Sequence, residues 1–146
     1  MNSGKNHHKN IEILIAEDSP TQAAQLQSLL EGHGYTVVAA PDGKTALALA
    51  RQRKPTLIVS DIMMPELDGY GLCRAIKSDE HLKSIPIILV TALSDPQDVI
   101  KGLQCGADNF IRKPYDATYL LSRVNYTLMN LDLRKNQKMR MGLEIS

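Results

Sequence analysis

The sequence alternates between two kinds of segment, and this alternation constrains the fold more than any other feature. Runs rich in Ile, Val and Leu, without a regular alternation of apolar and polar residues, cover residues 11–16, 35–40, 57–60, 85–91 and 109–111. Such continuous apolar strands are typical of a parallel sheet that is covered on both faces. Amphipathic stretches follow at about 20–31, 43–53, 69–77, 96–105 and from 116 onward.

The residues at the ends of these stretches support the alternation. Ser19-Pro20 and Asp95-Pro96 each place an N-cap residue before a proline at the first helical position, and Gly106 suits a helix end. Five strand–helix units in a row predict an α/β fold in which a parallel sheet is wound on both faces. The pattern alone does not give the strand order.

Composition excludes several classes of protein. A chain of 146 residues, 43% of them apolar, is expected to form one domain. No apolar run approaches the ~20 residues that a membrane span requires, the N-terminus lacks a secretory signal, and the two cysteines are too few for a disulfide scaffold. We therefore expect a cytoplasmic protein. Residues 11–133 hold eleven basic and fifteen acidic side chains, which argues against direct nucleic-acid binding by the folded part.

Reactive side chains follow four of the five predicted strands. Glu17 and Asp18 follow the first strand, Asp61 ends the third, Thr91 ends the fourth, and Lys113 follows the fifth. Because ligands of such sheets bind at the carboxyl ends of the strands, these side chains are expected to share one site.

This set of side chains suits phosphoryl transfer. Three converging carboxylates repel one another unless a cation neutralises them, and an all-oxygen site with few protein ligands suits Mg²⁺. A carboxylate beside Mg²⁺ can attack phosphorus and form an aspartyl phosphate. A lysine then neutralises charge on the transferring group, and a threonine hydroxyl can hydrogen-bond a phosphoryl oxygen.

Residues 11–130 resemble the receiver domain of two-component response regulators. The resemblance rests on four stretches in the same order: ILIAEDSP, LIVSDIMMPELDGYGL, IPIILVTAL and GADNFIRKPYD. It implies a flavodoxin-like (βα)5 fold, a five-stranded parallel sheet with strand order 2-1-3-4-5, and a phosphorylatable signalling switch rather than an enzyme. A histidine kinase or a phosphotransfer protein would supply the phosphoryl group from a phosphohistidine.

The resemblance also assigns the metal and phosphoryl ligands. Asp61 would be the phosphoacceptor and would also be a ligand of the metal. Asp18 would bind Mg²⁺ directly and Glu17 through water, and the backbone carbonyl of Met63 would be a further ligand.

Three more residues complete the implied switch. Lys113 would pair with the phosphate, and its peptide bond to Pro114 is expected to be cis. Thr91 would be the switch hydroxyl, and Phe110 would be the aromatic that turns inward when Thr91 moves. A core position for Phe110 is compatible with that role.

The output surface implied is the face made by the fourth helix, the fifth strand and the fifth helix. Val99, Ile100 and Tyr115 are candidate contacts there, for a partner or for a second copy of the chain in a homodimer.

Met63 lies two residues beyond the acceptor Asp61, and Leu93 lies two residues beyond the switch threonine Thr91. Both side chains are apolar and cannot orient a water molecule for attack on the phosphoryl group. This predicts slow autodephosphorylation.

One glycine and both cysteines have structural rather than chemical interpretations. Gly69 suits the turn into the third helix, and Cys73 and Cys105 are interpreted as small buried hydrophobic residues.

We expect a disordered polar tail at 1–10, the receiver domain at 11–131, and a basic helical extension at 132–146. That extension is helix-friendly until Gly142 and is either a linker to a missing effector domain or a frayed tail.

Two alternative functions remain open. One is a degenerate receiver that only binds proteins, against which the complete acidic set argues. The other is a phosphatase with an aspartyl nucleophile, which would need a second acid at position 63, where this chain has Met.

Overall fold

Five parallel strands form one sheet in the order β2-β1-β3-β4-β5, which confirms the fold class and the expected strand order. The computed structural model describes residues 10–92 and 95–145, with the side chains of the last helix described as far as residue 133. The strands are β1 (Glu12–Ala16), β2 (Thr36–Ala40), β3 (Leu57–Asp61), β4 (Ile87–Thr91) and β5 (Asn109–Arg112).

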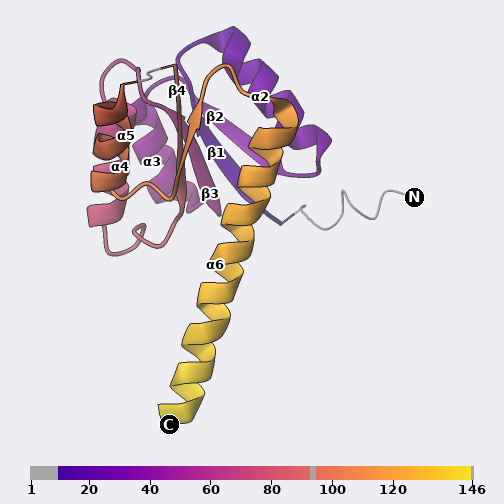
Figure 1. The fold of residues 1–146 in the computed structure, drawn as a ribbon, viewed down its shortest axis with the longest axis vertical. Coiled ribbons are helices and arrows are strands. Elements are labelled where there is room, and N and C mark those ends of the chain that lie inside the picture. The colour runs from indigo at the N-terminus through magenta and orange to yellow at the C-terminus, as the bar shows by residue number, and fades with distance from the viewer. Residues whose placement is uncertain (1–9, 93–94, 146) are drawn as a thin grey trace.

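The helices cover both faces of the sheet (Figure 1). They are α2 (Pro20–Gly32), α3 (Gly43–Arg53), α4 (Gly69–Ser78), α5 (Pro96–Gln104) and α6 (Ala117–Ile145). On one side α2 and α6 lie against the sheet, and α3, α4 and α5 lie on the other; the lower part of α6 extends beyond the body of the domain (Figure 1).

The strand residues alternate between two hydrophobic clusters, as the two-residue period of a strand requires. Ile13 and Ile15 of β1 pack with α2 and α6, whereas Leu14 and Ala16 pack with α3 and α4. Ile13 and Ile15 are fully buried. Replacing either by alanine should cost about 2–5 kcal/mol of stability, because the core cannot collapse fully around the cavity. These clusters hold the strand ends in place.

The structure shifts two predicted boundaries. The fourth strand begins at Ile87 rather than at 85, because Pro86 has no N–H to donate; its carbonyl still accepts from the Ile58 N–H at 3.0 Å. The last helix passes through Gly142 to Ile145, a position where glycine costs a helix only about 1 kcal/mol. Residues 1–9 and Leu93 lie outside the described residues, and the domain boundaries stay a prediction.

Both cysteines are buried and unpaired by disulfide, as expected. The Cys73 thiol donates to the Cys105 carbonyl at 3.2 Å. Burial, and after it the interaction with the Cys105 side chain, raises the pKa of the Cys73 thiol. None of the described helices combines the length and apolar character that a bilayer crossing requires.

Candidate functional site

The parallel strands bring the predicted site residues to one edge of the sheet. Glu17 and Asp18 follow β1, which lies beside β3, and Asp61 is the last residue of β3. One carboxylate oxygen from each of these three residues lies within 4.8 Å of the other two. Convergence of the three acids, expected from the strand ends, is thus present in the fold.

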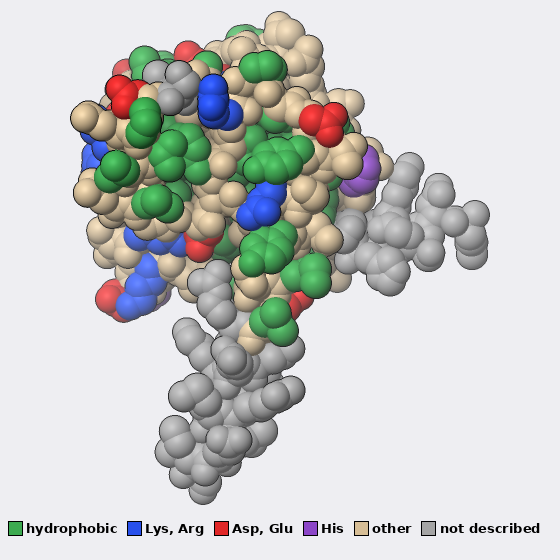
Figure 2. All heavy atoms as spheres, in the orientation of Figure 1, with side chains coloured by type: hydrophobic (Ala, Val, Ile, Leu, Met, Phe, Trp, Pro, Cys, Tyr) green, Lys and Arg blue, Asp and Glu red, His purple; other side chains and the backbone are tan. Residues whose placement is uncertain are grey.

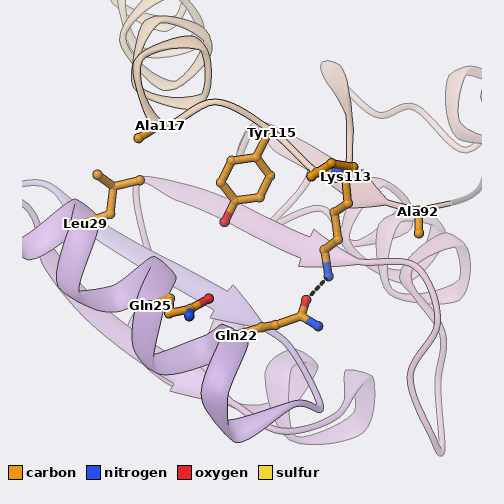
Figure 3. A pocket seen from close by; sticks show the side chains of 8 residues that line it. Gln22, Gln25, Leu29, Ala92, Lys113, Tyr115 and Ala117 are labelled. Carbon is orange, nitrogen blue, oxygen red and sulfur yellow. Dashed lines mark hydrogen bonds between the residues drawn. The ribbon is translucent and has the colours of Figure 1, made fainter.

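Lys113 supplies a positive charge to this cluster. Its Nζ lies 2.8 Å from Glu17 Oε1 and 3.2 Å from Asp61 Oδ2, and a third bond of 2.5 Å reaches Gln22 Oε1 on α2 (Figure 3). The side chains of Lys113, Glu17 and Asp61 are only 19%, 7% and 12% exposed. Burial by itself lowers the pKa of Lys113, but the bond to Glu17 and the charge of Asp61 outweigh it and raise the pKa above its ordinary value. The ammonium therefore stays charged.

Hydrogen bonds to the backbone hold Glu17 and Asp61 in position. The Glu17 N–H donates to the Ala40 carbonyl at 3.0 Å, and Glu17 Oε2 accepts from the Ser19 N–H at 3.1 Å. Asp61 Oδ1 accepts from the Ile62 N–H at 2.7 Å. Glu17 is buried while Asp18 is exposed, so the cluster opens to solvent on the side of Asp18.

The N-cap of α2 is part of this arrangement. Ser19 Oγ accepts from the Gln22 N–H at 3.3 Å, and Pro20 occupies the first helical turn, both as the sequence indicated. The cap fixes the first turn of α2 directly after Glu17 and Asp18. This position brings Gln22 within hydrogen-bonding distance of Lys113.

Gly69 opens α4, as expected, and the loop after β3 shows why this position is glycine. Its backbone does not need a positive φ; among the non-glycine residues of that loop, Glu66 adopts one, at 72°. A Cβ on Gly69 would lie 2.4 Å from the Asp61 carbonyl oxygen and 2.8 Å from the Ile62 Cα. Glycine is thus required because the loop passes directly over the backbone of Asp61.

The remaining site residues lie close by, with their predicted roles untested. Thr91 ends β4, is buried, and its carbonyl accepts from the Lys113 N–H at 2.7 Å. The peptide bond between Lys113 and Pro114 is cis, as expected. Phe110 is half-buried against the cluster that packs with α3 and α4, and it lies over Gly102, where a Cβ would sit 2.9 Å from its ring. The Met63 side chain is 64% exposed.

The donor set fits a hard divalent cation. Three carboxylates against one ammonium leave an excess of two negative charges around a cluster of oxygen atoms. Such all-oxygen sites favour Mg²⁺ or Ca²⁺ over the softer transition metals. The residues present could therefore hold the Mg²⁺ that the resemblance implies.

A pocket of about 610 Å³ lies beside Lys113. Figure 3 shows Gln22 and Gln25 of α2 on one side of it, with Lys113 and Tyr115 on the other. The pocket leaves this side of Lys113 uncovered by other side chains.

Fold and site together define a doubly wound α/β protein with three carboxylates at one edge of its sheet, which could hold a metal ion, and a partly buried lysine beside them. The family model described as the response regulator receiver domain matches residues 13–125, and the chain belongs to this family. Receiver domains are signalling switches that interact with histidine kinases and effector domains.

Two curated relatives show how similar the chain is to individual proteins. The chain is 40% identical to protein PilH of Pseudomonas aeruginosa over 116 residues, covering 80% of this chain and 96% of PilH. It is 40% identical over 120 residues to the DNA-binding dual master transcriptional regulator RpaA of Synechocystis sp., covering 82% of this chain and 50% of RpaA. The chain spans about half the length of the first curated relatives that it matches.

A solved structure shows the same fold. The signal receiver domain of a signal transduction histidine kinase from Syntrophus aciditrophicus is 49% identical, with a TM-score of 0.77, and the match covers 82% of this chain and 90% of that one.

Sequence reasoning missed Gln22. A glutamine in the first turn of an amphipathic helix is usually an ordinary surface residue, so its residue type does not indicate a role in the site. Its position four residues after Asp18 could have indicated one, because α2 begins at the edge of the sheet where the reactive side chains lie.

Proposed function

We propose that the chain accepts a phosphoryl group on Asp61 from the phosphohistidine of a histidine kinase or phosphotransfer protein. An Asp61 oxygen forms a bond to phosphorus while the phosphorus–nitrogen bond breaks, and the imidazole leaves with the electron pair. The observation that carries the proposal is the convergence of Glu17, Asp18 and Asp61 within 4.8 Å, with Lys113 bonded to two of them.

The chain's own groups prepare Asp61 for this step. The Ile62 N–H holds Asp61 Oδ1, and Lys113 lies beside Oδ2, where it can neutralise charge on an incoming phosphoryl oxygen. Glu17, Asp18, Asp61 and the backbone carbonyl of Met63 would hold Mg²⁺, which when bound neutralises the carboxylates and the phosphoryl oxygens.

The switch would run through Thr91 and Phe110 to the face formed by α5, β5 and α6. Moving two states from 1:99 to 99:1 needs roughly 5.5 kcal/mol, which two or three charge-assisted hydrogen bonds of ~1.5–3 kcal/mol can supply. The backbone bond between Lys113 and Thr91 connects the two strands involved.

Exposed apolar side chains support this output face. Among the described residues, seven large hydrophobic side chains are exposed, and six of them belong to α5 or α6: Ile100, Leu103, Tyr119, Tyr126, Met129 and Leu133. Figure 2 shows hydrophobic side chains over α5 and along the upper part of α6. Through the face formed by α5, β5 and α6, the domain would contact an effector domain or a second copy of the chain. Helix α6 would connect the domain to such an effector domain.

Incubation with Mg²⁺ and acetyl phosphate, followed by intact-mass measurement, tests the proposal. We expect a base-labile gain of one phosphoryl group, absent in Asp61→Asn and retained in Asp68→Asn. Asp68 is a suitable control because it caps α4 through the Gly71 N–H, and asparagine caps equally well. No adduct would favour a module that only binds proteins, and steady phosphate release would favour a phosphatase.

A further inference from the structure

All three N–H groups of the Lys113 ammonium have an acceptor. A lysine offers three donors and no acceptor, and here they are matched by Glu17 Oε1, Asp61 Oδ2 and Gln22 Oε1 at 2.8, 3.2 and 2.5 Å. A phosphoryl oxygen arriving on Asp61 can receive a hydrogen bond from Lys113 only if one of these three acceptors gives up its own.

The acceptor that costs least to release is Gln22. Glu17 is buried and charged, so an unpaired Glu17 carboxylate would be costly. Asp61 carries the phosphoryl group and stays beside Lys113. Gln22 is neutral and exposed, so water can replace Lys113 at its carbonyl, and its side chain has the open pocket to turn into.

We propose that Gln22 is a positioning residue that occupies one donor of Lys113 before phosphorylation and is displaced by the phosphoryl oxygen. The inference rests on the proposed function and adds a residue to it. While bound, Gln22 draws the ammonium toward the rim of the site and stabilises the unphosphorylated state. Once the Asp61–phosphorus bond has formed and the donor's bond to phosphorus has broken, Lys113 donates to the new oxygen and Gln22 turns to solvent.

Displacement of Gln22 predicts different effects on the rate of phosphorylation and on the rate of hydrolysis. Because Gln22 contacts Lys113 only before transfer, removing it should speed phosphorylation and leave hydrolysis of the phosphorylated form unchanged. A residue that merely held Lys113 in the active position would slow both reactions when removed. A negative charge at position 22 should hold Lys113 more tightly and slow phosphorylation.

The test measures labelling by acetyl phosphate at saturating Mg²⁺, where acetate leaves with the electron pair, and then decay after removal of the donor. We expect Gln22→Met to label about three- to tenfold faster, Gln22→Glu to label more slowly, and both to decay like the native protein. Gln25→Met is the matched control, because Gln25 lines the same pocket one turn along α2 without a bond to Lys113 among those described (Figure 3). Near-ultraviolet circular dichroism checks that each variant is folded.

A spectroscopic measurement follows the bond itself. The side-chain amide signals of Gln22, assigned by their loss in Gln22→Met, should shift on phosphorylation, and those of Gln25 should not. If the native protein takes no adduct, the proposed function fails and the inference with it. If it labels on Asp61 but Gln22→Met labels at the native rate or more slowly, or the Gln22 signals stay in place, the inference alone is overturned.

Discussion

Replacing Asp61 by asparagine should stabilise the protein when divalent cations are removed. Asp61 lies 3.2 Å from the Lys113 ammonium, an attraction of about 5 kcal/mol at an effective dielectric constant near 20. It also lies within 4.8 Å of carboxylate oxygens of Glu17 and Asp18, and each repulsion is then at least about 3.5 kcal/mol on the same scale. Repulsion thus exceeds attraction by about 2 kcal/mol.

Two further effects adjust this figure. Water screens the exposed Asp18, which reduces its repulsion, whereas the neutral amide avoids the desolvation cost of a carboxylate that is 12% exposed. An asparagine oxygen still accepts from the Ile62 N–H. We therefore expect a gain of about 1–2 kcal/mol, which raises Tm by roughly 2–8 °C in a domain of this size.

Thermal and urea unfolding in EDTA measure the gain, with Asp68→Asn as a control that should change Tm little. Added Mg²⁺ should then favour the native protein, by about 2.7 kcal/mol at 100 times its Kd, and the variant, with one carboxylate fewer, by less. A variant that is less stable than the native protein in EDTA, or a gap between them that Mg²⁺ leaves unchanged, would refute the reasoning.

Three other predictions follow from the loops and the switch. Gly69→Ala should destabilise the protein by about 1–3 kcal/mol and slow labelling of Asp61, because the new Cβ would clash with the backbone of Asp61 and Ile62. Urea unfolding measures the loss of stability. The control Gly32→Ala, with open space around the new Cβ, should change the stability by no more than about 1 kcal/mol. Met63→Asn should shorten the half-life of the phosphorylated protein in a decay assay, because an amide can orient the attacking water; an unchanged half-life would contradict this. Gly102→Ala should displace the Phe110 ring, visible as shifted aromatic NMR signals, and an unmoved ring would show that the contact is not tight.

The order of strands and helices was determined by sequence pattern alone. Apolar runs without polar alternation marked strands buried on both faces, and residues such as Ser19 and Asp95 marked helix starts through a bond that spans only a few residues. The same local pattern placed Asp61 and Lys113 after strands, and hence at one edge. Strand order came only with the resemblance, because period and capping carry no information about which strands pair.

Contacts between distant residues needed the tertiary structure. Gly69 reads as a turn residue in sequence, and only the fold shows that its missing Cβ leaves room for the Asp61 backbone. Gln22 and Lys113 are 91 positions apart, and their bond exists because α2 begins at the edge where β5 ends. Sequence patterns report what each segment buries, whereas which donor meets which acceptor depends on how the segments pack in three dimensions.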